Sequence, residues 1–103
     1  MHRFSRLVRV AETGSTNDDV ARILGEPEAR GLVLTAGFQH HGAGRRGRTW
    51  VAPAGSALLC TIAPPDPLPS AHLWMVPFWA ALVTKDALAA LGAACALQWP
   101  NDV

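Results

Sequence analysis

Residues 40–50, HHGAGRRGRTW, hold a cluster of side chains that could bind an anion. Three glycines and three arginines share this stretch: Gly42, Gly44, Arg45, Arg46, Gly47 and Arg48. Guanidinium groups offer planar forks that match carboxylates and phosphates, and glycine lets backbone approach a ligand closely. The combination predicts an anion-binding loop, with a solvated loop whose charges serve solubility as the alternative.

The arginines, more than the glycines, carry this prediction. The glycine spacing matches G-x-G-x-x-G, but the segment opens no helix as a dinucleotide-binding fingerprint does. The G-x-x-x-x-G-K-[ST] pattern of a P-loop does not occur. Glycine spacing alone would be a weak signal.

Short alternating elements are expected to position this loop. Residues 7–11 are rich in strand-forming types, and Ser15 followed three residues later by Asp18 predicts a helix over about 16–24. GLVLTAGF at 31–38 and ALLCTIA at 57–63 are apolar on both alternating faces, which predicts strands covered on both sides.

The second half of the sequence predicts a connection, a helix and a last strand. PPDPLPS at 64–70 indicates an irregular connection between elements of one domain. An apolar residue recurs every four positions over about 71–91, which predicts a helix that Pro77 either kinks or begins and that Gly92 ends. Residues 95–99 then predict a strand, so the order β-α-β-loop-β-α-β indicates an α/β domain.

Composition narrows the class of protein. The 103 residues, 50% of them apolar, suffice for about one small domain, and a net charge of +1 argues against a general nucleic-acid or membrane surface. The N-terminus lacks the apolar core of a signal peptide, and no run is expected to reach the ~18 apolar residues of a membrane span. Cys60 and Cys95 indicate buried free thiols in a reducing compartment. A cytoplasmic protein is expected.

Four motifs in order resemble the catalytic domain of biotin–protein ligases over essentially the whole chain. They are STN at 15–17, Gln39 followed by GAGRRGRTW at 42–50, PAGS at 53–56 and WPND at 99–102. The resemblance implies an α/β (α+β) fold, a mixed sheet flanked by helices and related to class II aminoacyl-tRNA synthetases. It also implies that biotin and ATP, with Mg²⁺, form biotinyl-5′-AMP. Biotin then passes to a lysine of a biotin carboxyl carrier protein domain of a carboxylase, and a homodimer is possible.

The resemblance assigns roles to individual residues. Biotin contacts are implied for Ser15, Thr16, Asn17, Gln39, Gly42, Ala43, Gly44 and Arg45. ATP contacts are implied for Arg45, Arg46, Gly47, Arg48, Trp50, Asn101 and Asp102, with Asp102 also a metal ligand and with Arg45 and Arg48 catalytic. Read alone, residues 15–17 equally predict a helix cap, Trp50 a core or loop-base side chain, and residues 100–102 an ordinary turn.

Two positions depart from the family pattern, and one residue is missing. Ala43 stands where the family's G-R-G-R-R-G-R usually has its first arginine, and Gln98 where lysine usually precedes Trp-Pro-Asn-Asp. The only lysine is Lys85, whereas the family's activating lysine lies beyond this segment. Residues 1–103 are therefore expected to be the N-terminal part of one catalytic domain, incomplete and inactive by itself.

Two other functions remain open at this point. A lipoate-type ligase of the same superfamily is disfavoured because its arginine-serine-triple-glycine signature is absent. A non-enzymatic RNA-binding module that uses the arginine loop and Trp50 is disfavoured by the near-neutral charge. The loop itself is expected to be poorly ordered without a ligand, because its arginines repel one another.

Overall fold

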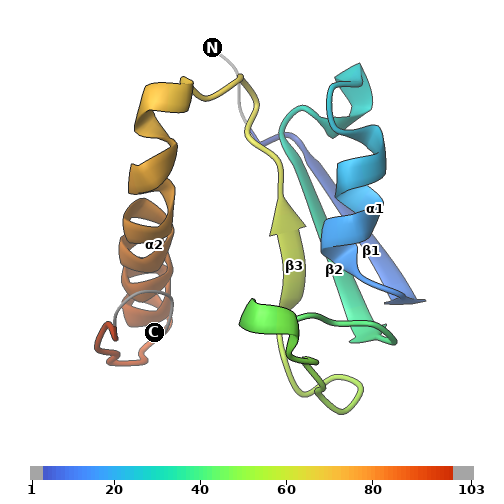
Figure 1. The fold of residues 1–103 in the computed structure, drawn as a ribbon. Coiled ribbons are helices and arrows are strands. Elements are labelled where there is room, and N and C mark those ends of the chain that lie inside the picture. Colours follow the sequence, from blue (N-terminus) through green and yellow to red (C-terminus); the bar gives the residue numbers. More distant parts are fainter. Residues whose placement is uncertain (1–3, 99–103) are drawn as a thin grey trace. The chain divides into compact units, whose positions relative to one another are not determined.

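A computed structural model describes residues 4–98 of the chain (Figure 1). The chain divides into two compact units, an N-terminal unit, Met1–Pro67, and a C-terminal unit, Leu68–Val103. The N-terminal unit contains β1 (Arg6–Thr13), α1 (Thr16–Ile23), the 3-10 turn η1 (Pro27–Ala29), β2 (Leu32–Gln39), the 3-10 turn η2 (Arg45–Gly47) and β3 (Leu59–Ile62). The C-terminal unit contains the 3-10 helix η3 (Ser70–Met75) and α2 (Val76–Ala90).

The three strands form one mixed sheet in the order β1-β2-β3. β1 and β2 are parallel, with α1 in the connection between them, whereas β2 and β3 are antiparallel. A parallel pair needs a crossover connection, and the short helix supplies it. The mixed sheet with helices confirms the fold class that the sequence predicted.

The core of the N-terminal unit lies between α1 and one face of the sheet. Val20 of α1 packs with Leu32, Leu34 and Ala63, all at most 8% exposed. α1 contacts both β2 and β3 from this side (Figure 1). Within the N-terminal unit the strands bury this one face, so the predicted cover on both sides is not provided by the unit itself.

α1 begins where the sequence predicted. Ser15 has an extended backbone, and its side chain accepts a hydrogen bond from the backbone N–H of Asp18 at 3.4 Å. This is the N-cap arrangement, which satisfies one of the free N–H groups of the first turn. Asp19 in the first turn and Arg22 in the last also complement the helix dipole.

The predicted helix over 71–91 is two helices in sequence. Pro77 stands in the first turn of α2, where its missing N–H leaves no helical bond unmade, so it marks a start and causes no kink. Gly92, with φ of +93°, ends α2, and the N–H of Ala93 donates to the carbonyl of Leu88 at 2.8 Å. This is the Schellman type of helix ending.

The predicted strand over 95–99 is not found over 95–97, and of its described residues only Gln98 takes part in a β-bridge. Residues 93–97 have no regular structure, and Trp99 lies outside the described range. The segment AACAL is rich in alanine, which is depleted in strands. It also follows directly on the helix stop, and no strand is found among the described residues of the C-terminal unit that could pair with it.

Apolar residues surround most of α2, so the prediction of a single apolar stripe was too narrow. The stretch Ser70–Ala90, 21 residues long, is apolar enough to cross a membrane by length and composition alone. This corrects the expectation that no run approaches such a span. A core helix of a soluble protein passes the same test, and one such helix is weak evidence for a membrane.

Both cysteines are free, as the sequence predicted, but each is only partly buried. Burial raises the pKa of the Cys60 thiol, which favours the neutral and less reactive form. Cys60 is therefore a partly covered side chain of β3 with no disulfide partner.

Candidate functional site

The start of α1 and the end of β2 are joined through one amide side chain. Oε1 of Gln39 accepts hydrogen bonds from the backbone N–H of Thr16 at 2.8 Å and from Oγ1 of Thr16 at 3.0 Å. A backbone N–H can only donate, so it fixes the oxygen of Gln39 toward α1. The NH2 group of Gln39 then has no protein partner among residues 4–98 and can donate to a ligand.

A residue of β3 completes this arrangement. Oγ1 of Thr61 lies 2.8 Å from Oγ1 of Thr16, and Thr61 also donates to Oδ1 of Asn17. We call the four residues Thr16, Asn17, Gln39 and Thr61 the polar cluster. It links α1, β2 and β3 at one end of the unit, so the predicted biotin contacts Thr16, Asn17 and Gln39 do come together.

Sequence reasoning missed Thr61. The residue sits in the strand ALLCTIA, which was assigned to the core for its apolar character. Thr61 is the only residue with a hydroxyl group in that run, and the register pairs it with Leu34 of the core face. A lone polar residue on the inner face of an apolar strand is the signal that could have identified it.

Ser15 stands beside the polar cluster but is used for capping. It is 7% exposed, and the N–H of Asp18 donates to its side-chain oxygen. The sequence left two functions open for Ser15, a biotin contact and a helix cap, and the structure contains the helix cap. A hydroxyl in a cap keeps its own proton, so it can still donate to a second group.

Residues 42–50 form a small hairpin, which we call the arginine hairpin. At its base the N–H of Trp50 donates to the carbonyl of Gly42 at 2.8 Å, and Ala43 forms an isolated β-bridge with Thr49. The backbone of the loop therefore has a defined path through its own hydrogen bonds. That the loop is poorly ordered without a ligand stays a prediction.

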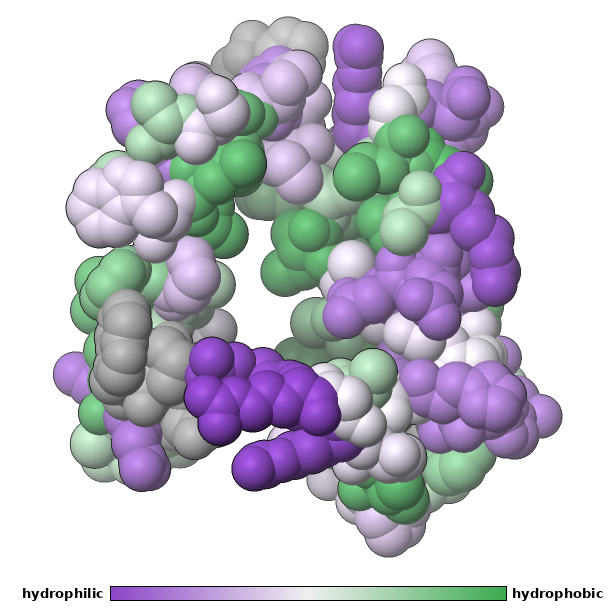
Figure 2. Space-filling model, in the orientation of Figure 1, coloured by the Kyte–Doolittle hydropathy of each residue, from purple (hydrophilic) through white to green (hydrophobic). Residues whose placement is uncertain are grey.

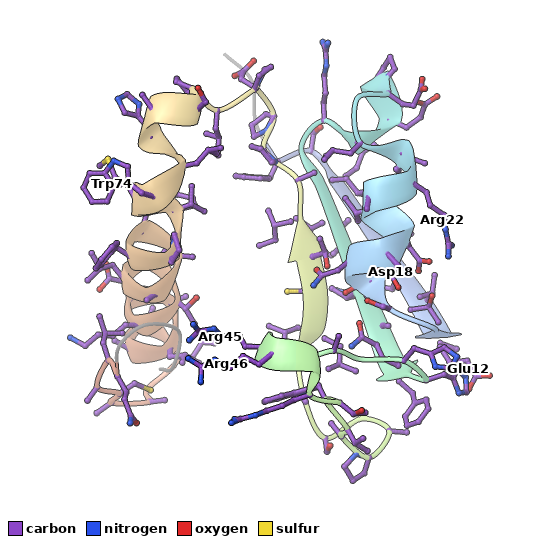
Figure 3. The ribbon with its side chains drawn as sticks, viewed as in Figure 1. Glu12, Asp18, Arg22, Arg45, Arg46 and Trp74 are labelled. Atoms are coloured by element: carbon purple, nitrogen blue, oxygen red, sulfur yellow. The ribbon has the colours of Figure 1, made fainter. Side chains whose placement is uncertain are left out.

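The tip of the hairpin is the 3-10 turn η2. The N–H of Gly44 donates to the carbonyl of Arg48 at 2.6 Å, which closes the turn. Arg46 has φ of 59° and ψ of 39°, and Gly47 follows with φ of +73°. Positive φ is uncommon for arginine and is found at tight turns and functional sites. Arg45 and Arg46 extend from this turn, away from the strands of the N-terminal unit (Figure 3).

Gly42 is required at the base of the hairpin. A Cβ added there would lie 2.6 Å from the carbonyl oxygen of Trp50, closer than Cβ atoms are found to backbone. The same Cβ would lie 3.1 Å from Nε2 of Gln39. Gly42 thus brings the hairpin backbone against the free NH2 group of the polar cluster, and joins the two parts of the site.

The guanidinium groups of the hairpin have no protein partner among the described residues. Within residues 4–98, Arg45, Arg46 and Arg48 are exposed and take part in no hydrogen bond or ion pair through their side chains. Strongly hydrophilic side chains project from the turn (Figure 2). Three guanidinium groups on a closed turn could together bind a multiply charged anion.

Trp50 and the histidines before the hairpin occupy different surroundings. Trp50 is 58% exposed, so its ring is not a core or loop-base side chain and is open for stacking. His40 contacts the ring of Phe38 and lies 3.7 Å from a carboxylate oxygen of Glu12, at the end of the sheet. The two remaining predicted residues, Asn101 and Asp102, lie outside the described range.

The described residues provide no ready metal site. In the range 4–98, no group of three or more histidine, cysteine, aspartate or glutamate side chains could hold a metal ion. The predicted ligand Asp102 is not among these residues. The described part of the site is therefore a polar cluster in which the NH2 group of Gln39 is left to donate, next to a hairpin whose guanidinium groups have no partner within residues 4–98.

The same residues fall within the match to one family model. The model of the biotin/lipoate A/B protein ligase family matches residues 9–103, which include the polar cluster and the arginine hairpin. The chain belongs to this family. Its described part supplies the family fold through the sheet β1-β2-β3 and the helix α1.

Individual relatives agree with the family match. The chain is 36% identical over 100 residues to the biotin–[acetyl-CoA-carboxylase] ligase of Mycobacterium tuberculosis, covering 91% of this chain and 38% of the relative. It is 40% identical over 102 residues to the enzyme of the same name from Paracoccus denitrificans, covering 91% of this chain and 40% of the relative. The chain thus spans about two fifths of the length of the curated relatives it matches.

A solved structure supports the fold. The crystal structure of biotin protein ligase from Leishmania major in complex with biotinyl-5-AMP matches with a TM-score of 0.71 and 24% identity. The match covers 84% of this chain and 35% of that one. At this identity the likeness shows a shared fold.

Proposed function

We propose that the protein carrying this chain is a biotin–protein ligase. It forms biotinyl-5′-AMP from biotin and ATP and transfers biotin to a lysine of a biotin carboxyl carrier domain of a carboxylase. The observation that carries the proposal is a polar cluster with an amide NH2 group left to donate, beside a hairpin whose three arginine side chains have no partner within residues 4–98. The names of the curated relatives support the choice of biotin as the substrate.

The polar cluster suits the ureido end of biotin. The oxygen of Gln39 is occupied by Thr16, so its NH2 group is the part left to meet a ligand, and a urea oxygen is a strong acceptor for it. Sites built from hydrogen bonds reject analogues that lack the matching group, because buried polar atoms are then left unpaired. We expect Asn17 to contribute a second contact at this end.

The arginine hairpin suits the other end of the reaction. Activation brings the biotin carboxylate against the α-phosphate of ATP, and two anions repel strongly where water is excluded. Arg45 and Arg48 would offset this repulsion, while the carboxylate oxygen forms a bond to the α-phosphorus and pyrophosphate leaves. Trp50 would offer its exposed face to the adenine, worth ~1–3 kcal/mol if stacked.

The hairpin would also protect the product of the first step. Biotinyl-5′-AMP is a mixed anhydride that water hydrolyses, and covering it with the hairpin would retain it until a lysine amine attacks the carbonyl and AMP leaves. Mg²⁺ would neutralise part of the triphosphate charge, with Asp102 as the candidate ligand. We further propose that residues 1–103 are part of a single catalytic domain of a cytoplasmic protein.

Titration of the intact protein with three ligands tests the proposal. Biotin, lipoate and a single-stranded RNA oligonucleotide are added in separate calorimetric experiments, and we expect biotin alone to bind. Incubation with biotin, MgATP and a carrier domain should then yield avidin-reactive carrier and pyrophosphate in equal amounts. Binding of lipoate without biotin would make the protein a lipoate-type ligase, and binding of the oligonucleotide alone would refute the ligase function.

A further inference from the structure

Thr61 contacts two residues of the polar cluster although it lies on a different element. Its hydroxyl oxygen is 2.8 Å from Oγ1 of Thr16 and donates to Oδ1 of Asn17. The side chains of β3 alternate between the two faces of the sheet, so Thr61 and Cys60 point to opposite sides. Thr61 is thus the one residue of β3 that connects the sheet to the start of α1 through side-chain hydrogen bonds in the described structure.

A count of protons fixes the direction of these hydrogen bonds. Thr16 and Thr61 have one hydroxyl proton each, yet their oxygens make three contacts, with Gln39, with each other and with Asn17. Oε1 of Gln39 already accepts the backbone N–H of Thr16 at 2.8 Å. The oxygen of Asn17 can only accept, so the hydroxyl proton of Thr61 goes to Asn17 and Thr61 can only accept from Thr16. The single hydroxyl proton of Thr16 lies within reach of both Thr61 at 2.8 Å and Gln39 at 3.0 Å.

This direction determines what Asn17 shows to a ligand. Its oxygen accepts from Thr61, so its NH2 group is left without a partner among the described residues. Gln39 is in the same condition, because its oxygen is held by Thr16. The backbone N–H of Thr16 and the hydroxyl of Thr61 thus fix the two amide oxygens inside the cluster, which leaves the two NH2 groups as donors.

We propose that Thr61 is a positioning residue that turns the NH2 group of Asn17 toward the ligand. Thr61 does not touch the ligand itself, and it acts by holding the oxygen of Asn17. Two NH2 donors select a ligand with a carbonyl-type oxygen, which in biotin is the ureido oxygen. This inference rests on the proposed function, since it deepens the description of the same site.

Biotin affinity of Thr61 variants in the intact protein tests the role. Thr61→Val keeps the shape of the side chain and removes the hydroxyl, and we expect it to raise the Kd for biotin roughly 5- to 20-fold. Thr61→Ser retains the hydroxyl and should stay within about twofold of the wild type. Cys60→Val, on the other face of the same strand, is the matched control and should leave the Kd unchanged.

A double-mutant cycle separates positioning from general damage to the fold. In an Asn17→Ala background, Thr61→Val should change the Kd by less than about twofold, because its effect passes through Asn17. An undiminished effect in that background would overturn the proposal. Thr61→Ala is measured in the same cycle, so that poor folding of the valine variant does not prevent the comparison.

The outcomes distinguish this inference from the proposed function. If the wild-type protein fails to bind biotin, the proposed function is wrong. If the wild type binds biotin and Thr61→Val binds it equally well, the function stands and the role of Thr61 is refuted. Loss of affinity in both Thr61→Val and Thr61→Ser would also refute it, because the serine retains the hydroxyl.

Discussion

Replacing Gln39 by alanine should destabilise the N-terminal unit as well as abolish ligand binding. The change removes the acceptor for two donors of Thr16, a residue that is only 3% exposed. The hydroxyl of Thr16 can still donate to Thr61, so the backbone N–H is the group left without a partner. An unsatisfied buried donor costs ~1–3 kcal/mol. Water entering the space vacated by the side chain would offset part of this, and we expect a loss of ~1–2 kcal/mol in the free energy of unfolding.

Gln39→Glu is the matched variant that separates stability from binding. A carboxylate keeps the acceptor for Thr16, and a negative charge at the start of α1 is favoured by the helix dipole by ~0.3–1 kcal/mol. The free energy of unfolding should therefore stay near that of the wild type. The NH2 donor is lost, however, so the Kd for biotin should rise at least about tenfold.

Urea unfolding followed by tryptophan fluorescence, together with calorimetric titration of biotin, measures both quantities. If Gln39→Ala keeps the wild-type unfolding free energy within about 0.5 kcal/mol, the N–H of Thr16 is not held by this side chain as the distances indicate. If Gln39→Glu binds biotin as the wild type does, the NH2 group of Gln39 is not the part that meets the ligand.

Three further changes test the hairpin and the cap. Gly42→Ala would place a Cβ 2.6 Å from the carbonyl oxygen of Trp50 and should speed the release of biotinyl-5′-AMP at least about tenfold. The control Gly44→Ala would place its Cβ 3.3 Å from a side-chain atom of Arg48 and should speed the release less than about threefold. Equal release rates from the two variants would contradict this prediction. Ser15→Ala removes the 3.4 Å capping hydrogen bond and should lower the free energy of unfolding, measured in urea, by ~0.5–1 kcal/mol. An unchanged value would show that the cap does not stabilise α1. Arg45→Ala should speed the release of the adenylate about tenfold and leave the free energy of unfolding in urea unchanged, since the Arg45 side chain is exposed. A loss of both adenylate retention and stability would indicate a structural role for Arg45.

Local patterns in the sequence predicted the elements that position the site. The cap at Ser15 and the stop at Gly92 depend on a few neighbouring residues, and both are confirmed. Runs of strand-forming and apolar residues likewise predicted β1 and β2 within one to two residues at each end. Such features are visible in a sequence because their physical causes span only a few positions.

Features that depend on distant or backbone contacts were not predictable in the same way. Thr61 meets Thr16 across 45 positions, and in its own strand it is only one residue of an apolar run. The arginine hairpin is held by backbone hydrogen bonding between Gly42 and Trp50. Backbone hydrogen bonds require no particular side chain, so the sequence gives little sign of them. The strand expected from Cys95 is not found over 95–97, where the alanine-rich run AACAL offers few strand-forming residue types.

The bridge between Ala43 and Thr49 has a practical consequence for redesign of this loop. The pairing uses backbone atoms, so the side chain at position 43 can be exchanged without disturbing it. Position 43 is also where the family usually carries an additional arginine. A fourth guanidinium can therefore be grafted onto the stem by Ala43→Arg while Gly42 and the turn at the tip keep their geometry. The charge of the arginine hairpin can therefore be changed without changing the path of its backbone. Position 43 is thus a convenient place to tune how long an anionic intermediate is retained.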